Sequence, residues 1–250
     1  MSSDAKRQVY SSPRARRNYV RARQMGRASK GEYSRTADAW LARREFRRRV
    51  WHTAPGFLPF LLWPIPHRDP ISPMLYSIIL LLGVGLATGI LLEFRQIQRS
   101  GERDQRFWAV AGYAGSVLAV FLLFPGMPEL GMALVAVLAF GDGSATLGGL
   151  WFRGRALAWN RDKTIAGSAC FLLVGIPMSA IIYWGEANNL EAIEHNGAVS
   201  FGTALIVGAS ATVIAALAES LPSRINDNVR VGVAAALTLA TVQWLVVGWT

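Results

Sequence analysis

The chain has 250 residues, of which 52% are hydrophobic, and it combines a mean hydropathy of +0.28 with a formal net charge of +10. Ile71–Leu92 and Val231–Trp249 are stretches without a charge, each long enough to cross about 30 Å of hydrocarbon as a helix, which argues against a soluble domain. The single cysteine, Cys170, excludes an intrachain disulfide and makes a cysteine-based metal site implausible.

The basic charge belongs to the N-terminal tail. Residues 1–49 hold 15 Lys and Arg against four Asp and Glu, whereas the remainder is close to neutral. Residues 1–46 lack an apolar period, so we expect a disordered, Arg-rich cytosolic tail before a membrane domain at residues 47–250. We expect the tail to bind anionic lipid headgroups and consider nucleic acid an unlikely partner; a plain topology determinant is the alternative. Because nearly fifty polar residues come first, we expect no cleaved signal peptide.

Seven apolar segments follow the tail. They predict an all-α fold, a polytopic bundle of about seven transmembrane helices. The first is short and contains four prolines, so we expect a broken or partly re-entrant helix there. The segments lie at about 51–66, 71–92, 107–124, 129–150, 165–184, 200–218 and 230–249.

The charges of the connecting loops indicate the orientation. With the N-terminus in the cytosol, 25 of the 26 basic residues fall on the cytosolic side and only Arg68 lies outside, as the positive-inside rule requires. Omitting the first span would break this pattern. We therefore expect an integral, multi-pass membrane protein.

Ionisable residues gather near the cytosolic ends of these spans. A charge costs about 2.5–3.5 kcal/mol at the centre of a span, so its presence there needs a reason. Helix termination explains some of them. The residues are His52, Glu93, Arg95, Asp142, Lys163, Glu219 and Asp227.

Asp142 follows the apolar run 130–140 and is flanked by Gly141 and Gly143. The spacing of small residues here is also typical of close helix packing, which explains the glycines but not the carboxylate. A carboxylate at this position suits Mg²⁺, a hard ion that takes oxygen ligands and retains water or substrate phosphates.

Two further loops add charged and polar groups. The loop before the fifth span carries Lys163, followed by Thr164, Gly167 and Ser168 at a helix start, where N–H groups and the helix dipole favour an anion. Helix capping by the hydroxyls is the plainer interpretation. The loop before the last span places Glu219 and the segment 226–228 where both could face Asp142.

These motifs together resemble the CTP-dependent membrane lipid kinases, namely dolichol kinase, phytol kinase and yeast-type diacylglycerol kinase, to which phosphatidate cytidylyltransferases are related. The resemblance spans about residues 47–230. It differs from the family pattern at Thr164, Ala166 and Asn226. The segments that carry it are Arg48-Arg49-Val-Trp-His52, Glu93-Phe-Arg95, Gly141-Asp142-Gly143-Ser-Ala145…Gly148, Lys163-Thr-Ile-Ala-Gly167-Ser168 and Glu219…Asn226-Asp227-Asn228.

The resemblance implies Mg²⁺-dependent transfer of the γ-phosphoryl group of CTP, with ATP as the alternative donor, to the hydroxyl of a membrane lipid. Catalytic roles are implied for His52, Glu93, Asp142 and Lys163, with His52 or Glu93 accepting the lipid proton. Magnesium ligands would be Asp142, Glu219 and Asp227. The residues implied in nucleotide binding are Gly141, Gly143, Ser144, Gly148, Arg153, Lys163, Thr164, Gly167, Ser168 and Asn228.

Two other functions remain open at this point. A related cytidylyltransferase would make a CDP-lipid from a lipid phosphate. A non-catalytic membrane scaffold would use the basic tail for binding.

Overall fold

The computed structural model of the chain describes residues 52–63, 72–95, 103–152, 154–189 and 197–248. For residues 86, 87, 90, 91, 93–95 and 103–109 it describes the backbone alone. The described residues belong to one compact unit, Trp51–Thr250. The predicted disordered tail at residues 1–46 lies outside this part of the chain.

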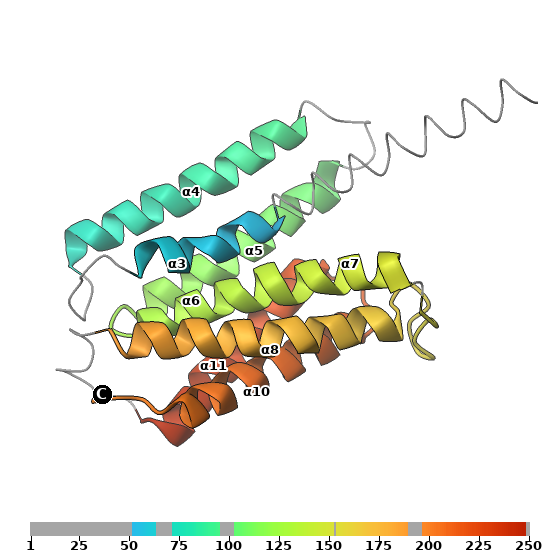
Figure 1. Cartoon of the computed structure of the whole chain (residues 1–250). Coiled ribbons are helices and arrows are strands. Elements are labelled where there is room, and N and C mark those ends of the chain that lie inside the picture. Colours follow the sequence, from blue (N-terminus) through green and yellow to red (C-terminus); the bar gives the residue numbers. More distant parts are fainter. Residues whose placement is uncertain (1–51, 64–71, 96–102, 153, 190–196, 249–250) are drawn as a thin grey trace, which may run out of the picture. The chain divides into compact units, whose positions relative to one another are not determined.

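The fourth apolar segment forms the central helix of the unit. Helices α6 (Pro128–Ala136) and α7 (Gly143–Phe152) run in line, joined by the π-helical turn η2 (Val137–Asp142), and Figure 1 shows them beside α8. Within the most apolar stretch of this 25-residue helix, 83% is buried, compared with 28–39% for the corresponding stretches of the other three long apolar helices. The central helix is therefore the core of the bundle, and its neighbours direct most of their apolar surface outward.

Three long helices pack around this core. They are α8 (Ile165–Ala187), α10 (Phe201–Ser220) and α11 (Asp227–Val246). Helix α8 packs against α6, η2, α7 and α10, and α10 packs against α11. Their outward residues include Leu173, Leu237 and Leu245, all more than 60% exposed, a surface that suits lipid rather than water.

Each of these helices begins at a side-chain cap, which satisfies a first-turn N–H group that has no partner within the helix. Thr164, Ser200 and Asn226 accept hydrogen bonds from the backbone N–H groups of Gly167, Thr203 and Asn228. Helix α10 ends at Ser220 because Leu221 precedes Pro222 and adopts the extended conformation that proline favours in its neighbour.

The remaining described elements lie on the other side of the core. Helix α4 (Pro73–Arg95) packs on α5 (Arg103–Leu123), which packs on α6 and α11. In the described part of the first apolar segment, residues 52–63, the helices are η1 (Ala54–Phe57) and α3 (Leu58–Leu62), and residues 52 and 53 are helical as well. The rest of this segment lies outside the described residues, so the broken or partly re-entrant helix stays a prediction.

The structure confirms the predicted fold class, an all-helical membrane bundle. Each of the seven apolar segments contains helix, and the described residues contain no strand beyond an isolated bridge between Ala156 and Thr164. In the described part, four helices are long and apolar enough to cross a membrane: the central helix 128–152 and α8, α10 and α11. The apolar stretches described in α4 and α5 are shorter, Pro73–Gly85 and Val110–Leu123.

Candidate functional site

Asp142 is the last residue of the π-helical turn, ten residues before the end of the central helix. Its side chain is largely buried, and its Oδ2 lies 2.9 Å from Nε2 of His52, two residues before the start of η1. The same Nε2 lies 3.2 Å from the carbonyl oxygen of Leu138. Packing of the first apolar segment on the π turn therefore joins two motifs that lie 90 residues apart in sequence.

Lys163 joins two further motifs. Its ammonium Nζ lies 2.7 Å from Oε1 of Glu219, in the last turn of α10, and 2.8 Å from Oδ2 of Asp227, the first residue of α11. Glu219 is buried, whereas the Asp227 side chain is 43% exposed. One cation thus holds two carboxylates together across the turn between α10 and α11.

Burial lowers the pKa of the Lys163 ammonium, but the charge of Glu219 and the hydrogen bonds to Asp227 and Glu219 outweigh that effect. The pKa of Lys163 therefore lies above its ordinary value. The side chain carries its positive charge throughout the neutral pH range.

Arg230 completes the contacts of Asp227, although it is not among the predicted site residues. Its Nη2 donates to Oδ1 of Asp227 at 2.8 Å and to the carbonyl oxygen of Glu219 at 3.3 Å. The guanidinium therefore ties the first turn of α11 to the last turn of α10. A sequence signal existed, because residues three apart on a helix share a face and an Asp–Arg pair at this spacing forms an ion pair.

The loop before α8 is anchored so that Lys163 reaches these carboxylates. The N–H of Leu157 donates to the carbonyl of Lys163, and the side chains of Trp159 and Asn160 both donate to the carbonyl oxygen of Ser220 at 3.1 Å. These contacts hold the loop against the end of α10.

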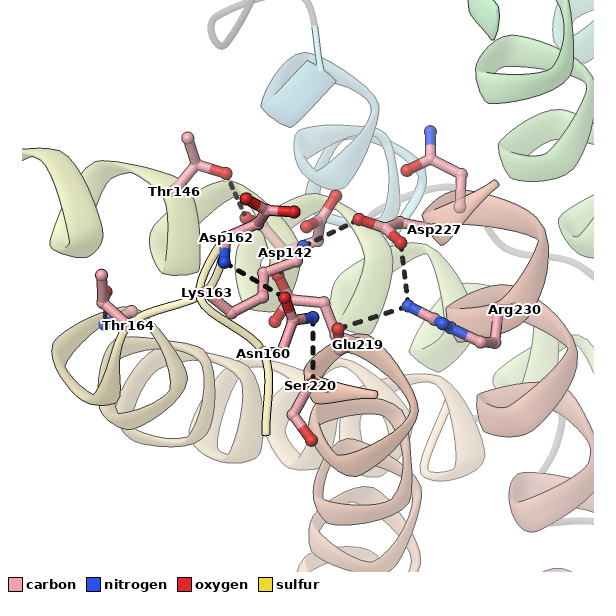
Figure 2. A network of polar contacts seen from close by, with 12 residues as sticks. Asp142, Thr146, Asn160, Asp162, Lys163, Thr164, Glu219, Ser220, Asp227 and Arg230 are labelled. Carbon is pink, nitrogen blue, oxygen red and sulfur yellow. Dashed lines mark hydrogen bonds and ion pairs between the residues drawn. The ribbon is translucent and has the colours of Figure 1, made fainter. Parts of the chain in front are cut away.

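We refer to His52, Asp142, Lys163, Glu219, Asp227 and Arg230 as the polar cluster. Figure 2 shows the side chains of Asp142, Lys163, Glu219, Asp227 and Arg230 turned toward one another from η2, the loop before α8, α10 and α11. The carboxylates of Asp142 and Glu219 are close enough to interact electrostatically. The structure thus brings together five of the predicted catalytic and metal-binding residues.

Several predicted nucleotide-binding residues have packing partners in the structure. A Cβ at Gly141 would lie 2.7 Å from the ring of Phe171, and the Ser144 hydroxyl lies 2.9 Å from the carbonyl oxygens of Gly141 and Cys170. Gly148 packs against Cys170, Gly167 packs against the Ala145 carbonyl, and Thr164 caps α8. Close helix packing and capping account for these residues, and their contact with a nucleotide stays a prediction.

The other predicted site residues are placed less fully. Ser168 lies in the first turn of α8, and Asn228 in the first turn of α11. Glu93 lies near the end of α4, but its side chain is outside the described part of the structure, as is all of Arg153. Their predicted roles stay predictions.

The carboxylates of the polar cluster offer hard oxygen donors of the kind that Mg²⁺ prefers. Within the described residues, no three His, Cys, Asp or Glu side chains converge as a complete set of protein ligands. Magnesium usually needs only one or two carboxylates, because substrate phosphates and water complete its shell. Glu219 and Asp227 meet this requirement chemically, since one oxygen of each already contacts a single cationic centre, the Lys163 ammonium.

The fold and the polar cluster define a helical membrane protein with buried carboxylates and cations joined at the turn between its last two helices. No protein-family model matches the chain, and no solved structure matches it significantly. Curated relatives confirm the resemblance to membrane lipid kinases. The chain is 26% identical to the probable phytol kinase 2 of Oryza sativa subsp. japonica over 197 residues, which cover 75% of this chain and 62% of the rice protein.

Two further relatives agree. The probable phytol kinase of Triticum aestivum is 26% identical over 223 residues, covering 83% of this chain and 72% of that protein. The farnesol kinase of Arabidopsis thaliana is 24% identical over 202 residues, covering 76% and 63%. All three are named as chloroplastic. The chain spans somewhat less than two thirds of the length of the rice and Arabidopsis relatives.

Proposed function

We propose that the protein transfers the γ-phosphoryl group of CTP to the hydroxyl of an isoprenoid alcohol of the phytol or farnesol type. One observation carries the proposal: His52, Asp142, Lys163 and Glu219 come from four separate sequence motifs, yet they lie in one polar cluster. The names of the relatives favour an isoprenoid alcohol over diacylglycerol as the acceptor. They also favour a kinase over the related cytidylyltransferase.

Phosphoryl transfer depends on positioning and on charge neutralisation more than on covalent catalysis by the protein. The polar cluster holds three carboxylates against the two cations Lys163 and Arg230, a net formal charge of −1 when His52 is neutral. A nucleoside triphosphate carries several negative charges, so this cluster would repel it without a divalent cation. The charge balance therefore supports Mg²⁺ dependence.

Residue roles follow from these contacts. Glu219 and Asp227, with Asp142, would hold Mg²⁺, which when bound supplies positive charge to the transferring phosphoryl group. Lys163 is anchored beside both carboxylates and keeps its charge at neutral pH, so it would neutralise phosphate oxygens. Arg230 keeps Asp227 in place through a hydrogen bond to the other oxygen of that carboxylate.

The acceptor alcohol would reach the cluster from the bilayer. Four long apolar helices, three of them with outward apolar surfaces, support a multi-pass protein, and the distribution of basic loops supports a cytosolic N-terminus with the polar cluster near the cytosolic face. An active site at this level would meet a membrane-dissolved alcohol and a water-soluble nucleotide on the same side.

The direct test uses purified protein in lipid vesicles with CTP or ATP labelled at the γ-phosphate. Phytol, farnesol, longer prenols and diacylglycerol serve as separate acceptors. The label is expected in the phosphate ester of phytol or farnesol, with CTP as the better donor, and chelation of divalent cations with EDTA should stop the transfer.

Each other outcome has a distinct meaning. Release of the label as pyrophosphate, with a lipid phosphate as acceptor, would identify a cytidylyltransferase instead. A purified, folded protein that labels none of these alcohols with either nucleotide would contradict the proposed function.

A further inference from the structure

The ring nitrogen Nε2 of His52 has two oxygen neighbours. It lies 2.9 Å from Oδ2 of Asp142 and 3.2 Å from the carbonyl oxygen of Leu138. A backbone carbonyl can only accept a hydrogen bond, and so can an ionised carboxylate. Nε2 therefore carries a hydrogen and donates it, whether the imidazole is neutral or charged. This nitrogen cannot take a proton from a substrate while it keeps these contacts.

Both acceptors belong to the π-helical turn. Leu138 is its second residue and Asp142 its last, so the imidazole spans the turn from near its start to its end. Short π-helical segments within α-helices are uncommon and frequently mark functional sites, because they alter the direction of the side chains that follow. The His52 contact thus fixes the carboxylate at the point where the helix returns to α geometry.

Close packing holds His52 in this position. The ring of His52 meets Tyr113 edge to face, with the ring centroids 5.3 Å apart. The next residue, Thr53, packs where Gly143 has no side chain, since a Cβ there would lie 2.7 Å from the Thr53 hydroxyl oxygen. Gly56 similarly lies directly against Ala139 of the π turn. The segment that contains η1 is therefore built onto the turn that carries Asp142.

We propose that His52 is a positioning residue, whose Nε2–H orients the Asp142 carboxylate for its role in the polar cluster, and that this nitrogen does not accept the proton of the lipid hydroxyl. The inference rests on the proposed function for the role of Asp142. It replaces the proton-accepting role that the family resemblance implied for His52. Hydrogen bonds of this kind fix carboxylates that bind metal ions, and their loss typically reduces metal affinity or activity about 10- to 100-fold.

The experiment compares His52→Gln with His52→Leu in the purified, vesicle-reconstituted protein. A glutamine side chain can present an N–H near the position of Nε2 but has no imidazole base, whereas leucine has neither. We expect His52→Leu to lower kcat about 10- to 100-fold with little change in the KM of the alcohol. His52→Gln should recover most of that loss. Binding of Mn²⁺, measured without nucleotide or lipid, should weaken in the leucine variant and be retained in the glutamine variant.

Thermal unfolding shows whether either variant is misfolded, and Asp162→Asn, at an exposed carboxylate outside the polar cluster, should match the wild type in both measurements. If the glutamine variant is as inactive as the leucine variant while both stay folded, His52 acts as a base and the inference is overturned. An unchanged leucine variant would overturn it as well. A wild-type protein without kinase activity would instead contradict the proposed function.

Discussion

The Lys163 ammonium lies 2.7 Å from the Glu219 carboxylate and thereby joins the loop before α8 to the last turn of α10. Glu219 is almost completely buried, so its charge depends on this partner. Removing one member of a buried ion pair leaves the other charge without a partner. This destabilises the fold more than replacing both members with apolar residues.

Lys163→Met should therefore reduce both stability and activity. We expect the free energy of unfolding to fall by about 1–3 kcal/mol, the usual cost of a buried group left without its hydrogen-bond partner. Lys163→Arg keeps the charge and should recover much of the stability. Thermal unfolding in detergent measures this, with Arg161→Met at an exposed neighbouring position as the control. Equal losses in Lys163→Met and Arg161→Met would show that the contact with Glu219 is unimportant.

Asp142→Asn should abolish lipid phosphorylation without lowering the amount of folded protein. The substitution keeps the size of the side chain but removes the negative charge that would hold Mg²⁺. The matched control is Asp162→Asn, which removes a carboxylate from the exposed loop next to Lys163 and should leave turnover within about twofold. Transfer of the γ-label to phytol measures both variants. Full activity of Asp142→Asn would contradict a role in catalysis.

Gly143→Ala should weaken the docking of the first apolar segment on the central helix. The added Cβ would lie 2.7 Å from the Thr53 hydroxyl oxygen but 3.8 Å from its Cβ, so Thr53→Ala should relieve the clash. We expect lower activity and a lower melting temperature for the single variant and recovery in the double variant.

The control for this pair is Gly115→Ala in α5, where the added Cβ has no atom within 4 Å. Alanine favours a helix over glycine by about 1 kcal/mol, so this variant should be no less stable than the wild type. Failure of Thr53→Ala to rescue Gly143→Ala would show that another contact at Gly143 matters.

Deleting residues 1–40 separates an enzyme from a tether. The catalytic residues proposed above lie in the compact unit Trp51–Thr250, so the truncated enzyme should keep most of its turnover in detergent. The separate peptide of residues 1–40 should bind vesicles that contain anionic lipid, and added salt should weaken this binding. If turnover is lost while the membrane unit stays folded, the tail takes part in the reaction.

The sequence predicted the bundle because helix formation in a membrane is a local requirement. Where lipid surrounds the chain, a helix satisfies each backbone hydrogen bond within its own segment, so an apolar run of sufficient length indicates a helix whatever its neighbours are. The same reasoning predicts a helix break at the prolines of the first segment, part of which lies outside the described residues. Caps and turn residues, such as Thr164, were also recognisable from local chemistry.

Motif residues could be proposed from the sequence, but their partners could not. The contact of Lys163 with phosphate stays a prediction, and the sequence did not indicate that this side chain would also hold Glu219 and Asp227. His52 or Glu93 was predicted to accept a proton, but the contacts of His52 Nε2 with Leu138 and Asp142 in the π turn could not be predicted. Arg230 was not predicted in the site because a basic residue beside a membrane span is ordinarily a topology signal. Which group meets which depends on helix packing between segments far apart in the chain.

What the sequence determined by itself was therefore the helical membrane fold and the set of polar residues that such a fold would not carry without a reason. Only the tertiary structure decided their pairing, through the π-helical turn that ends at Asp142, the close approach of Thr53 to Gly143, and the return of the loop before α8 to the end of α10. The physical reason is that backbone hydrogen bonds in a helix join residues four or five apart, whereas ion pairs and packing contacts join whichever side chains the bundle brings within a few ångströms.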